Sequence, residues 1–102
     1  MNRKKIFVDI DETICFYDGV ERRGYRNAIP DYKNIDKINK LYEEGNYIKY
    51  WTARGSVSKI DYYSLTEKQL NDWGCKYHEL SVGEKPDYHL LICDRTKRIE
   101  EI

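Results

Sequence analysis

Short apolar runs alternate with amphipathic segments along this chain, and this alternation restricts its fold more than any other feature. The apolar runs are rich in β-forming residues, and the segments between them carry apolar residues at helical spacing and end in glycines. We expect strands at residues 6–10, 47–51, 76–80 and 90–93, and helices from near Pro30 to Gly45 and from Ser64 to Gly74. Strands separated by helices are typical of an α/β domain with a mainly parallel sheet.

The connections between these elements are also predictable in outline. Residues 13–29 are predicted to form a turn followed by a protruding loop or hairpin, and residues 53–63 a long loop. Ser64 and Glu67 have the spacing of a capping box, which would start the second helix at Ser64.

Length and charge exclude several classes of protein. With 102 residues the chain is long enough for one compact domain and too short for two. Its 18 basic side chains are balanced by 18 acidic ones, which argues against binding nucleic acid or a membrane surface through bulk positive charge. No apolar run approaches the ~20 residues of a membrane-spanning helix. Three separated cysteines without a CxxC pair fit neither a disulfide framework nor a zinc site, so we expect a cytoplasmic protein.

Polar residues stand at the ends of the predicted strands. Asp9 and Asp11 end the first strand, and Thr52 follows the second. Lys85 precedes the last predicted strand, and Asp94 follows it. The carboxyl ends of parallel strands meet at one edge of a sheet, so we expect these groups to converge there. Because Asp9 and Asp11 are two residues apart, their side chains should leave the strand on the same side.

This combination of groups suits phosphoryl transfer. Clustered carboxylates repel one another unless a cation lies between them, and hard oxygen ligands suit Mg²⁺. A carboxylate can also attack phosphorus, giving an aspartyl-phosphate that water later cleaves. Thr52 and Lys85 would hold the phosphoryl oxygens, while Asp11 would protonate the leaving alkoxide and later activate water.

Each residue taken alone also has a simpler interpretation. Thr52 could cap the loop after its strand, Lys85 could be a solvated surface charge, and Asp94 could be a helix N-cap. Arg54, in the loop after Thr52, either contacts substrate or phosphate or pairs with an acidic side chain. The arrival of all the motif residues in order at successive strand ends favours the functional interpretation.

These residues match the pattern of a known family. The segment Asp9-Ile10-Asp11-Glu12-Thr13, after the apolar run at residues 6–8, resembles the DxDxT signature of the haloacid dehalogenase (HAD) superfamily. Thr52, Lys85 and Asp94 resemble the second, third and fourth motifs of that superfamily, and the likeness covers nearly the whole chain. The DxDxT form points to a phosphatase rather than a dehalogenase.

The resemblance implies a single Rossmann-like, three-layer domain over residues 1–102, with a mainly parallel sheet. It implies a flap at about residues 14–27 and no cap domain, because the connections are too short to hold one. It also implies Mg²⁺ as cofactor, Asp9 as nucleophile, Asp11 as general acid and base, and phosphate binding by Thr52 and Lys85. The metal would be held by the Asp9 carboxylate, the backbone carbonyl of Asp11 and the Asp94 carboxylate.

Two details refine the resemblance. Residues 51–55 and 74–80 resemble small phosphatases described as polysaccharide or capsule biosynthesis proteins. Cys93-Asp94 stands where the fourth motif usually has two adjacent acids. We expect Asp94 to take the metal-contacting position, since a thiol such as Cys93 is a poor ligand for Mg²⁺.

The leading hypothesis is a Mg²⁺-dependent phosphomonoesterase acting on a small phosphorylated metabolite, with a sugar phosphate favoured. One alternative is a nucleotide or nucleic-acid-end phosphatase, because an open site admits large substrates, although zero net charge counts against nucleic acid. Others are a phospho-accepting receiver module and a degenerate, non-catalytic HAD-like binding domain. The sequence leaves the substrate and the oligomeric state open.

Overall fold

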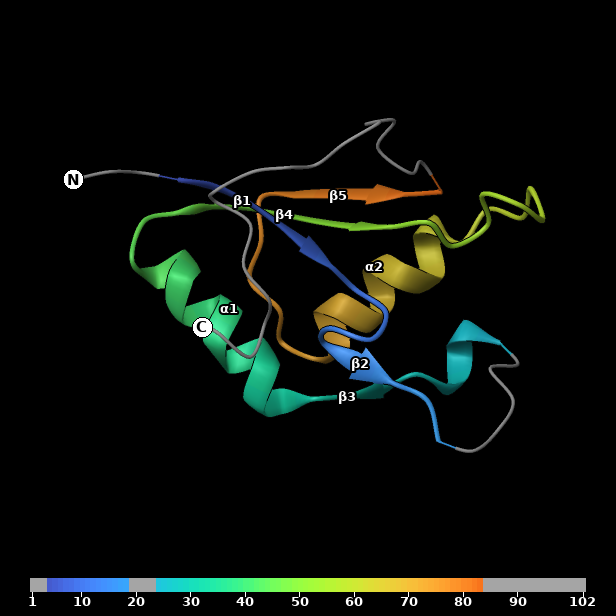
Figure 1. Ribbon diagram of the computed structural model, residues 1–102, viewed down its shortest axis with the longest axis horizontal. Coiled ribbons are helices and arrows are strands. Elements are labelled where there is room, and N and C mark those ends of the chain that lie inside the picture. Colours follow the sequence, from blue (N-terminus) through green and yellow to red (C-terminus); the bar gives the residue numbers. More distant parts are fainter. Residues whose placement is uncertain (1–3, 19–23, 84–102) are drawn as a thin grey trace.

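Three parallel strands form the central sheet of the protein (Figure 1). The computed structural model describes residues 4–18 and 24–83, so the predicted strand at residues 90–93 lies outside the described residues. The strands are β1 (Lys5–Asp9), β4 (Tyr47–Thr52) and β5 (Glu79–Val82), in the order β1-β4-β5. Helix α1 (Tyr32–Glu43) connects β1 to β4 by way of a small hairpin, and α2 (Tyr63–Asp72) connects β4 to β5. This confirms the predicted α/β domain with a mainly parallel sheet.

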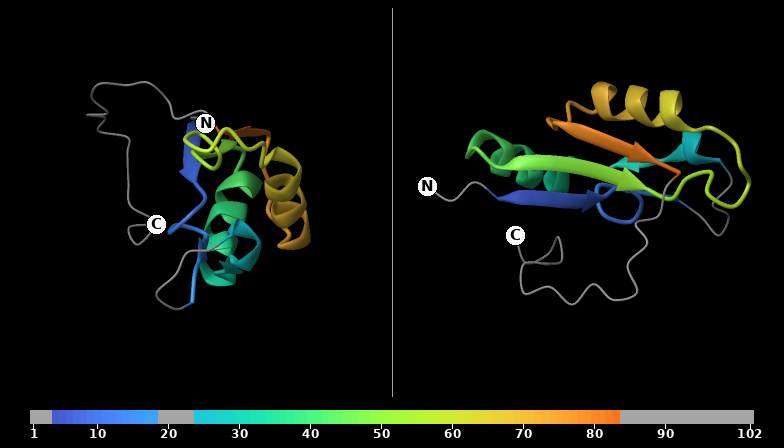
Figure 2. Two further views of the ribbon diagram at one scale, coloured as in Figure 1. Left: turned by 90° about the vertical axis from the view of Figure 1, so that its right-hand side faces the viewer. Right: turned by 90° about the horizontal axis from the view of Figure 1, so that it is seen from above.

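Both helices pack on the same face of the sheet (Figure 2). Two consecutive right-handed crossovers in one direction place both helices on one side of a parallel sheet. Among residues 4–18 and 24–83 the structure therefore shows two layers, and the third layer that the resemblance implies is not among them. No helix in these ranges has the length and apolar composition needed to cross a membrane.

The core lies between the sheet and the two helices. Strand β4 alternates strictly between buried and half-buried residues, and its buried positions are Ile48, Tyr50 and Thr52. Side chains along one stripe of α1, including Ile35 and Ile38, pack against this face of the sheet. The apolar face of the strand, which repeats every 2.0 residues, thus packs against the apolar stripe of the helix, which repeats every 3.6 residues.

A two-stranded hairpin follows β1, as the sequence predicts for residues 13–29. Its strands are β2 (Cys15–Phe16) and β3 (Ile29–Pro30), which pair antiparallel, with a 3-10 turn, η1 (Tyr25–Asn27), before β3. Of the predicted flap at about residues 14–27, residues 19–23 lie outside the described residues. Asp31 then caps α1 by accepting a hydrogen bond from the Asn34 amide at 3.1 Å.

The predicted capping box of α2 is wrong. The helix begins at Tyr63, and the side chain of its N-cap residue, Tyr62, makes no capping hydrogen bond. Asp61 explains the earlier start, because its carboxylate accepts a hydrogen bond from the Tyr63 amide at 2.9 Å. Ser64 therefore lies inside the first turn. The predicted ends are confirmed, since Gly45 and Gly74 follow α1 and α2 with positive φ angles.

Strand β5 begins three residues later than the sequence predicts. The ladder with β4 starts at the pair Lys49 and Glu79, not at residue 76. His78, just before the strand, is stacked between the rings of Tyr42 and Tyr47 at 4.7 and 4.6 Å. Its Nδ1 accepts a hydrogen bond from the Ile48 amide at 3.1 Å. The His78 side chain thus accepts the hydrogen bond from a β4 amide that the backbone of a longer β5 would have accepted.

Candidate functional site

A cleft of about 750 Å³ lies at the carboxyl ends of β1 and β4. Asp9 is the last residue of β1, and Thr52 is the last residue of β4. The predicted residues Asp9, Asp11 and Thr52 all line this cleft, together with Arg54 from the loop after β4. The structure therefore brings these three residues together at the sheet edge where α/β proteins carry their working sites.

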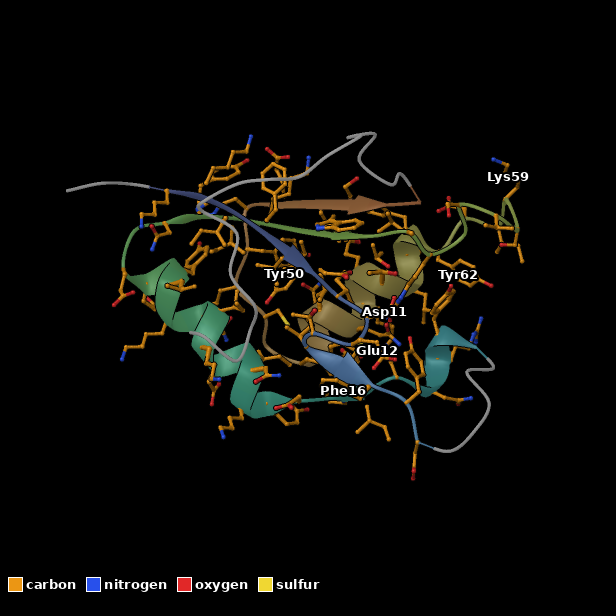
Figure 3. The ribbon with its side chains drawn as sticks, viewed as in Figure 1. Asp11, Glu12, Phe16, Tyr50, Lys59 and Tyr62 are labelled. Carbon is orange, nitrogen blue, oxygen red and sulfur yellow. The ribbon has the colours of Figure 1, made fainter. Side chains whose placement is uncertain are left out.

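Five side-chain donor atoms surround the carboxylate of Asp11, which is labelled in Figure 3, and one of them is the Cys15 thiol, with Sγ 3.6 Å from Oδ1. Arg54 makes a two-point contact, with Nη2 2.9 Å from Oδ1 and Nε 3.1 Å from Oδ2. Thr52 Oγ1 donates to Oδ2 at 3.0 Å, and the Tyr17 hydroxyl donates to Oδ1 at 2.6 Å. These contacts join the turn after β1, the hairpin and the end of β4 at one carboxylate.

This environment favours the ionised form of Asp11. Burial acts to raise the pKa of its carboxyl, but the hydrogen bonds and charge of Arg54, with those from Tyr17 and Thr52, outweigh burial and lower it. The same contact raises the pKa of Arg54 against the opposing effect of burial. Only 19% of the Asp11 side chain is exposed, so water weakens this ion pair far less than a surface pair.

Asp9 lies in a contrasting environment. Burial is the main cause of its raised pKa, and the charge of Asp11 adds to it. A hydrogen bond from the Ile10 backbone acts in the opposite direction without reversing the shift. The two carboxylates are therefore close enough to repel each other, which is the situation that a bound cation relieves.

Arg54 is buried, with 1% of the residue exposed. Its Nη1 donates to Thr66 Oγ1 at 3.1 Å and to Gln69 Oε1 at 2.6 Å, both on α2. Its guanidinium also lies over the Tyr25 ring, 4.8 Å from the ring centroid. Of the two sequence-based interpretations of Arg54, the structure shows pairing with an acid.

Thr52 also has its hydroxyl engaged. It donates to Asp11 and accepts a 3.3 Å hydrogen bond from the Arg54 amide, and the residue is 1% exposed at the base of the cleft. The predicted phosphate ligand Lys85 and metal ligand Asp94 lie outside the described residues. Within residues 4–18 and 24–83, no three His, Cys, Asp or Glu side chains are grouped to hold a metal ion.

Three residues of this network escape sequence analysis. Tyr17 follows strand β2 of the hairpin, and no local pattern predicts that its hydroxyl reaches Asp11. Thr66 and Gln69 are polar residues on the buried stripe of α2, next to Leu70. A polar residue on an inward-facing helical stripe needs a buried hydrogen-bond partner. The positions of Thr66 and Gln69 in the sequence could therefore have indicated a buried polar contact of α2.

Comparisons with known proteins support the fold. No protein-family model matches the chain, and no curated protein matches it. A crystal structure of a structural-genomics target from Vibrio cholerae is similar to it, with a TM-score of 0.77 and 26% sequence identity. The similarity covers 96% of this chain and 85% of the Vibrio chain. The described α/β arrangement thus recurs in a solved structure over nearly its whole length.

Proposed function

We propose that this protein is a phosphomonoester hydrolase with the HAD-like, Rossmann-type architecture, acting through an aspartyl-phosphate on Asp9. The observation that carries the proposal is the convergence of Asp9, Asp11 and Thr52 on one cleft at the carboxyl edge of a parallel sheet. A nucleophile, a proton carrier and a phosphoryl ligand are the groups that this chemistry requires.

The reaction proceeds in two displacements. An oxygen of the Asp9 carboxylate attacks phosphorus, the bond to the ester oxygen breaks, and that oxygen takes a proton from Asp11. In the second step Asp11 takes a proton from water, whose oxygen attacks phosphorus. The bond to Asp9 then breaks, which releases inorganic phosphate and restores the ionised Asp9.

Asp11 must change its protonation during this cycle. In the described structure its hydrogen bonds from Arg54, Tyr17 and Thr52 favour the carboxylate, which is the form needed to activate water. The first step needs the protonated form. Entry of a negatively charged phosphoryl group raises the proton affinity of Asp11, especially if Thr52 turns its hydroxyl from Asp11 to the phosphoryl oxygen.

A Mg²⁺ ion fits the residues on this side of the cleft. The Asp9 carboxylate offers a hard oxygen, and its pKa is raised mainly by burial and further by the nearby charge of Asp11, both of which a bound cation would offset. The Asp11 carboxylate is already occupied by protein donors, so Asp11 would contribute its backbone carbonyl. Asp94 is the proposed third protein ligand. When bound, the ion would neutralise charge on the transferring phosphoryl group.

The proposed substrate is a small phosphorylated metabolite, with a sugar phosphate favoured. Aromatic side chains line the cleft around the acidic residues, among them Tyr17, Tyr25 and Trp51. Such rings can pack against the apolar face of a sugar or against a base. Lys85 and Thr52 would hold the phosphoryl oxygens of this substrate. We also propose that the enzyme is cytoplasmic.

Phosphate release by the purified protein tests this proposal. The panel contains sugar phosphates, nucleotides and a 3′-phosphorylated oligonucleotide, each with Mg²⁺ and with EDTA. We expect Mg²⁺-dependent release from sugar phosphates that Asp9→Asn abolishes and Asp72→Asn leaves unchanged. Asp72 is a matched control because it is an exposed aspartate on α2, paired only with Lys68 in the described contacts.

Other outcomes have defined meanings. Preference for the oligonucleotide would favour a nucleic-acid-end phosphatase. Failure of the folded protein to release phosphate from any compound would favour a non-catalytic binding domain. Activity that survives Asp9→Asn would reject Asp9 as the nucleophile.

A further inference from the structure

Arg54 holds the Asp11 carboxylate at both oxygens from a buried position. The contacts of 2.9 and 3.1 Å form the two-point geometry in which the planar guanidinium matches a carboxylate. No part of the Arg54 side chain is exposed. Such a contact fixes the plane of the carboxylate as well as its distance, which a single hydrogen bond would not do.

Helix α2 in turn holds Arg54. Thr66 and Gln69 each accept a hydrogen bond from Nη1, at 3.1 and 2.6 Å. Gln69 also donates from Nε2 to the Tyr25 carbonyl at 2.7 Å, and Tyr25 lies under the guanidinium. Arg54 is therefore fixed by α2 on one side and by the hairpin on the other, so its position does not depend on a ligand.

The donors to Asp11 differ in how readily they can leave the carboxylate. The Arg54 contact is buried and supported by two elements, whereas Thr52 contributes one rotatable hydroxyl at the base of the cleft. If that hydroxyl turns to a phosphoryl oxygen, one lone pair of Asp11 Oδ2 is released toward the ester oxygen. The Arg54 contact would keep the rest of the carboxylate in place.

We infer that Arg54 is a positioning residue of the proposed hydrolase, which fixes Asp11 for proton transfer to the leaving oxygen and does not itself bind substrate. Thr66 and Gln69 support it from α2. This inference rests on the proposed function. It assigns to Arg54 a role in both proton transfers of Asp11, of which only the first depends on the leaving group.

Leaving groups that do not need a proton provide the test. A 4-nitrophenolate leaves without protonation, whereas the alkoxide of a sugar phosphate needs a proton. Arg54→Lys keeps the charge but loses the two-point contact. We expect it to lower kcat/KM for a sugar phosphate by about 100-fold, the cost of a misplaced catalytic group. The kcat/KM for 4-nitrophenyl phosphate should fall by less than about 3-fold, because kcat/KM reports only the steps up to formation of the aspartyl-phosphate, before Asp11 activates water.

Two further variants make the test independent of folding defects. Thr66→Val removes one acceptor of Arg54 in a nearly isosteric side chain, and it should lower the kcat/KM ratio of sugar to aryl phosphate on the order of 5-fold. Ile48→Val, a core substitution away from Asp11, should lower the melting temperature without changing that ratio.

The outcomes separate this inference from the proposed function. Equal loss of kcat/KM on both substrates in Arg54→Lys and Thr66→Val would overturn the positioning role. So would a rise in KM with kcat intact, which would make Arg54 a substrate ligand. Absence of phosphate release by the unmodified protein would overturn the proposed function, and with it this inference.

Discussion

The hydroxyl of Thr52 lies 3.0 Å from Oδ2 of Asp11, which joins the end of β4 to the turn that follows β1. The backbone prepares this contact, because the Ile10 amide donates to the Trp51 carbonyl at 3.2 Å just beyond the strand pair. The candidate phosphoryl ligand and the candidate proton carrier therefore share a hydrogen bond. Their relative positions follow from the register of two parallel strands rather than from a flexible loop.

Asp11 should make the stability of the protein depend on pH in the acid range. Its folded-state pKa lies below the ordinary value of about 3.9, so its contribution is complete above that pH and is lost as the pH falls through the folded value. In EDTA at pH 7, Asp11→Asn should lower the free energy of unfolding by about 3 kcal/mol, because Arg54 loses its charged partner. Urea unfolding at pH 7 and near pH 3 measures the difference, which should shrink at the lower pH. A difference that stays constant would contradict this account.

Asp9 should destabilise the metal-free protein. Its pKa is raised by burial and by the charge of Asp11, so the ionised form is disfavoured in the fold at neutral pH. The sign is opposite to that of Asp11, since the penalty is complete above the folded pKa and disappears below the unfolded value. Asp9→Asn should therefore raise the free energy of unfolding in EDTA at pH 7, measured by urea denaturation, whereas Asp72→Asn should not. A less stable Asp9→Asn protein would show that the repulsion is not significant.

Tyr50 carries a buried hydroxyl with no hydrogen-bond partner among the described residues. Burial raises its pKa, and Cys75 lies near enough to add to the shift. Tyr50→Phe removes the cost of burying this hydroxyl, so the free energy of unfolding should rise by about 1 kcal/mol. Thermal and urea denaturation measure this gain. A loss of stability would mean that the hydroxyl has a partner, with the Cys75 thiol as the first candidate.

Gly55 shapes the loop that forms one side of the cleft. Its φ is +83°, and a Cβ at this position would overlap the Ile60 carbonyl oxygen. Gly45 is a matched control, since it also has a positive φ but has no atom within 4 Å of a built Cβ. Gly45→Ala should cost about 1–2 kcal/mol of unfolding free energy, and Gly55→Ala clearly more. Equal losses in urea denaturation would show that the loop moves aside without cost.

The sequence predicts the sheet, the helices and the shared cleft of Asp9, Asp11 and Thr52, because these depend on local periodicity and on the geometry of parallel strands. It does not settle the role of Arg54. That role depends on the depth of the side chain and on partners in α2 and the hairpin, which are far apart in the sequence. The start of β5 is missed for a similar reason, since the His78 side chain replaces a strand contact.

The most direct test of the central claim is to look for the phosphoryl group on Asp9. The protein is mixed with Mg²⁺ and a phosphorylated substrate that it hydrolyses, quenched rapidly in acid, digested and analysed by mass spectrometry. We predict that the peptide containing Asp9 gains the mass of one phosphoryl group, and that Asp9→Asn abolishes both this gain and phosphate release. Phosphate release at full rate with no phosphoryl group on Asp9 at any quench time, together with an active Asp9→Asn protein, would contradict the account.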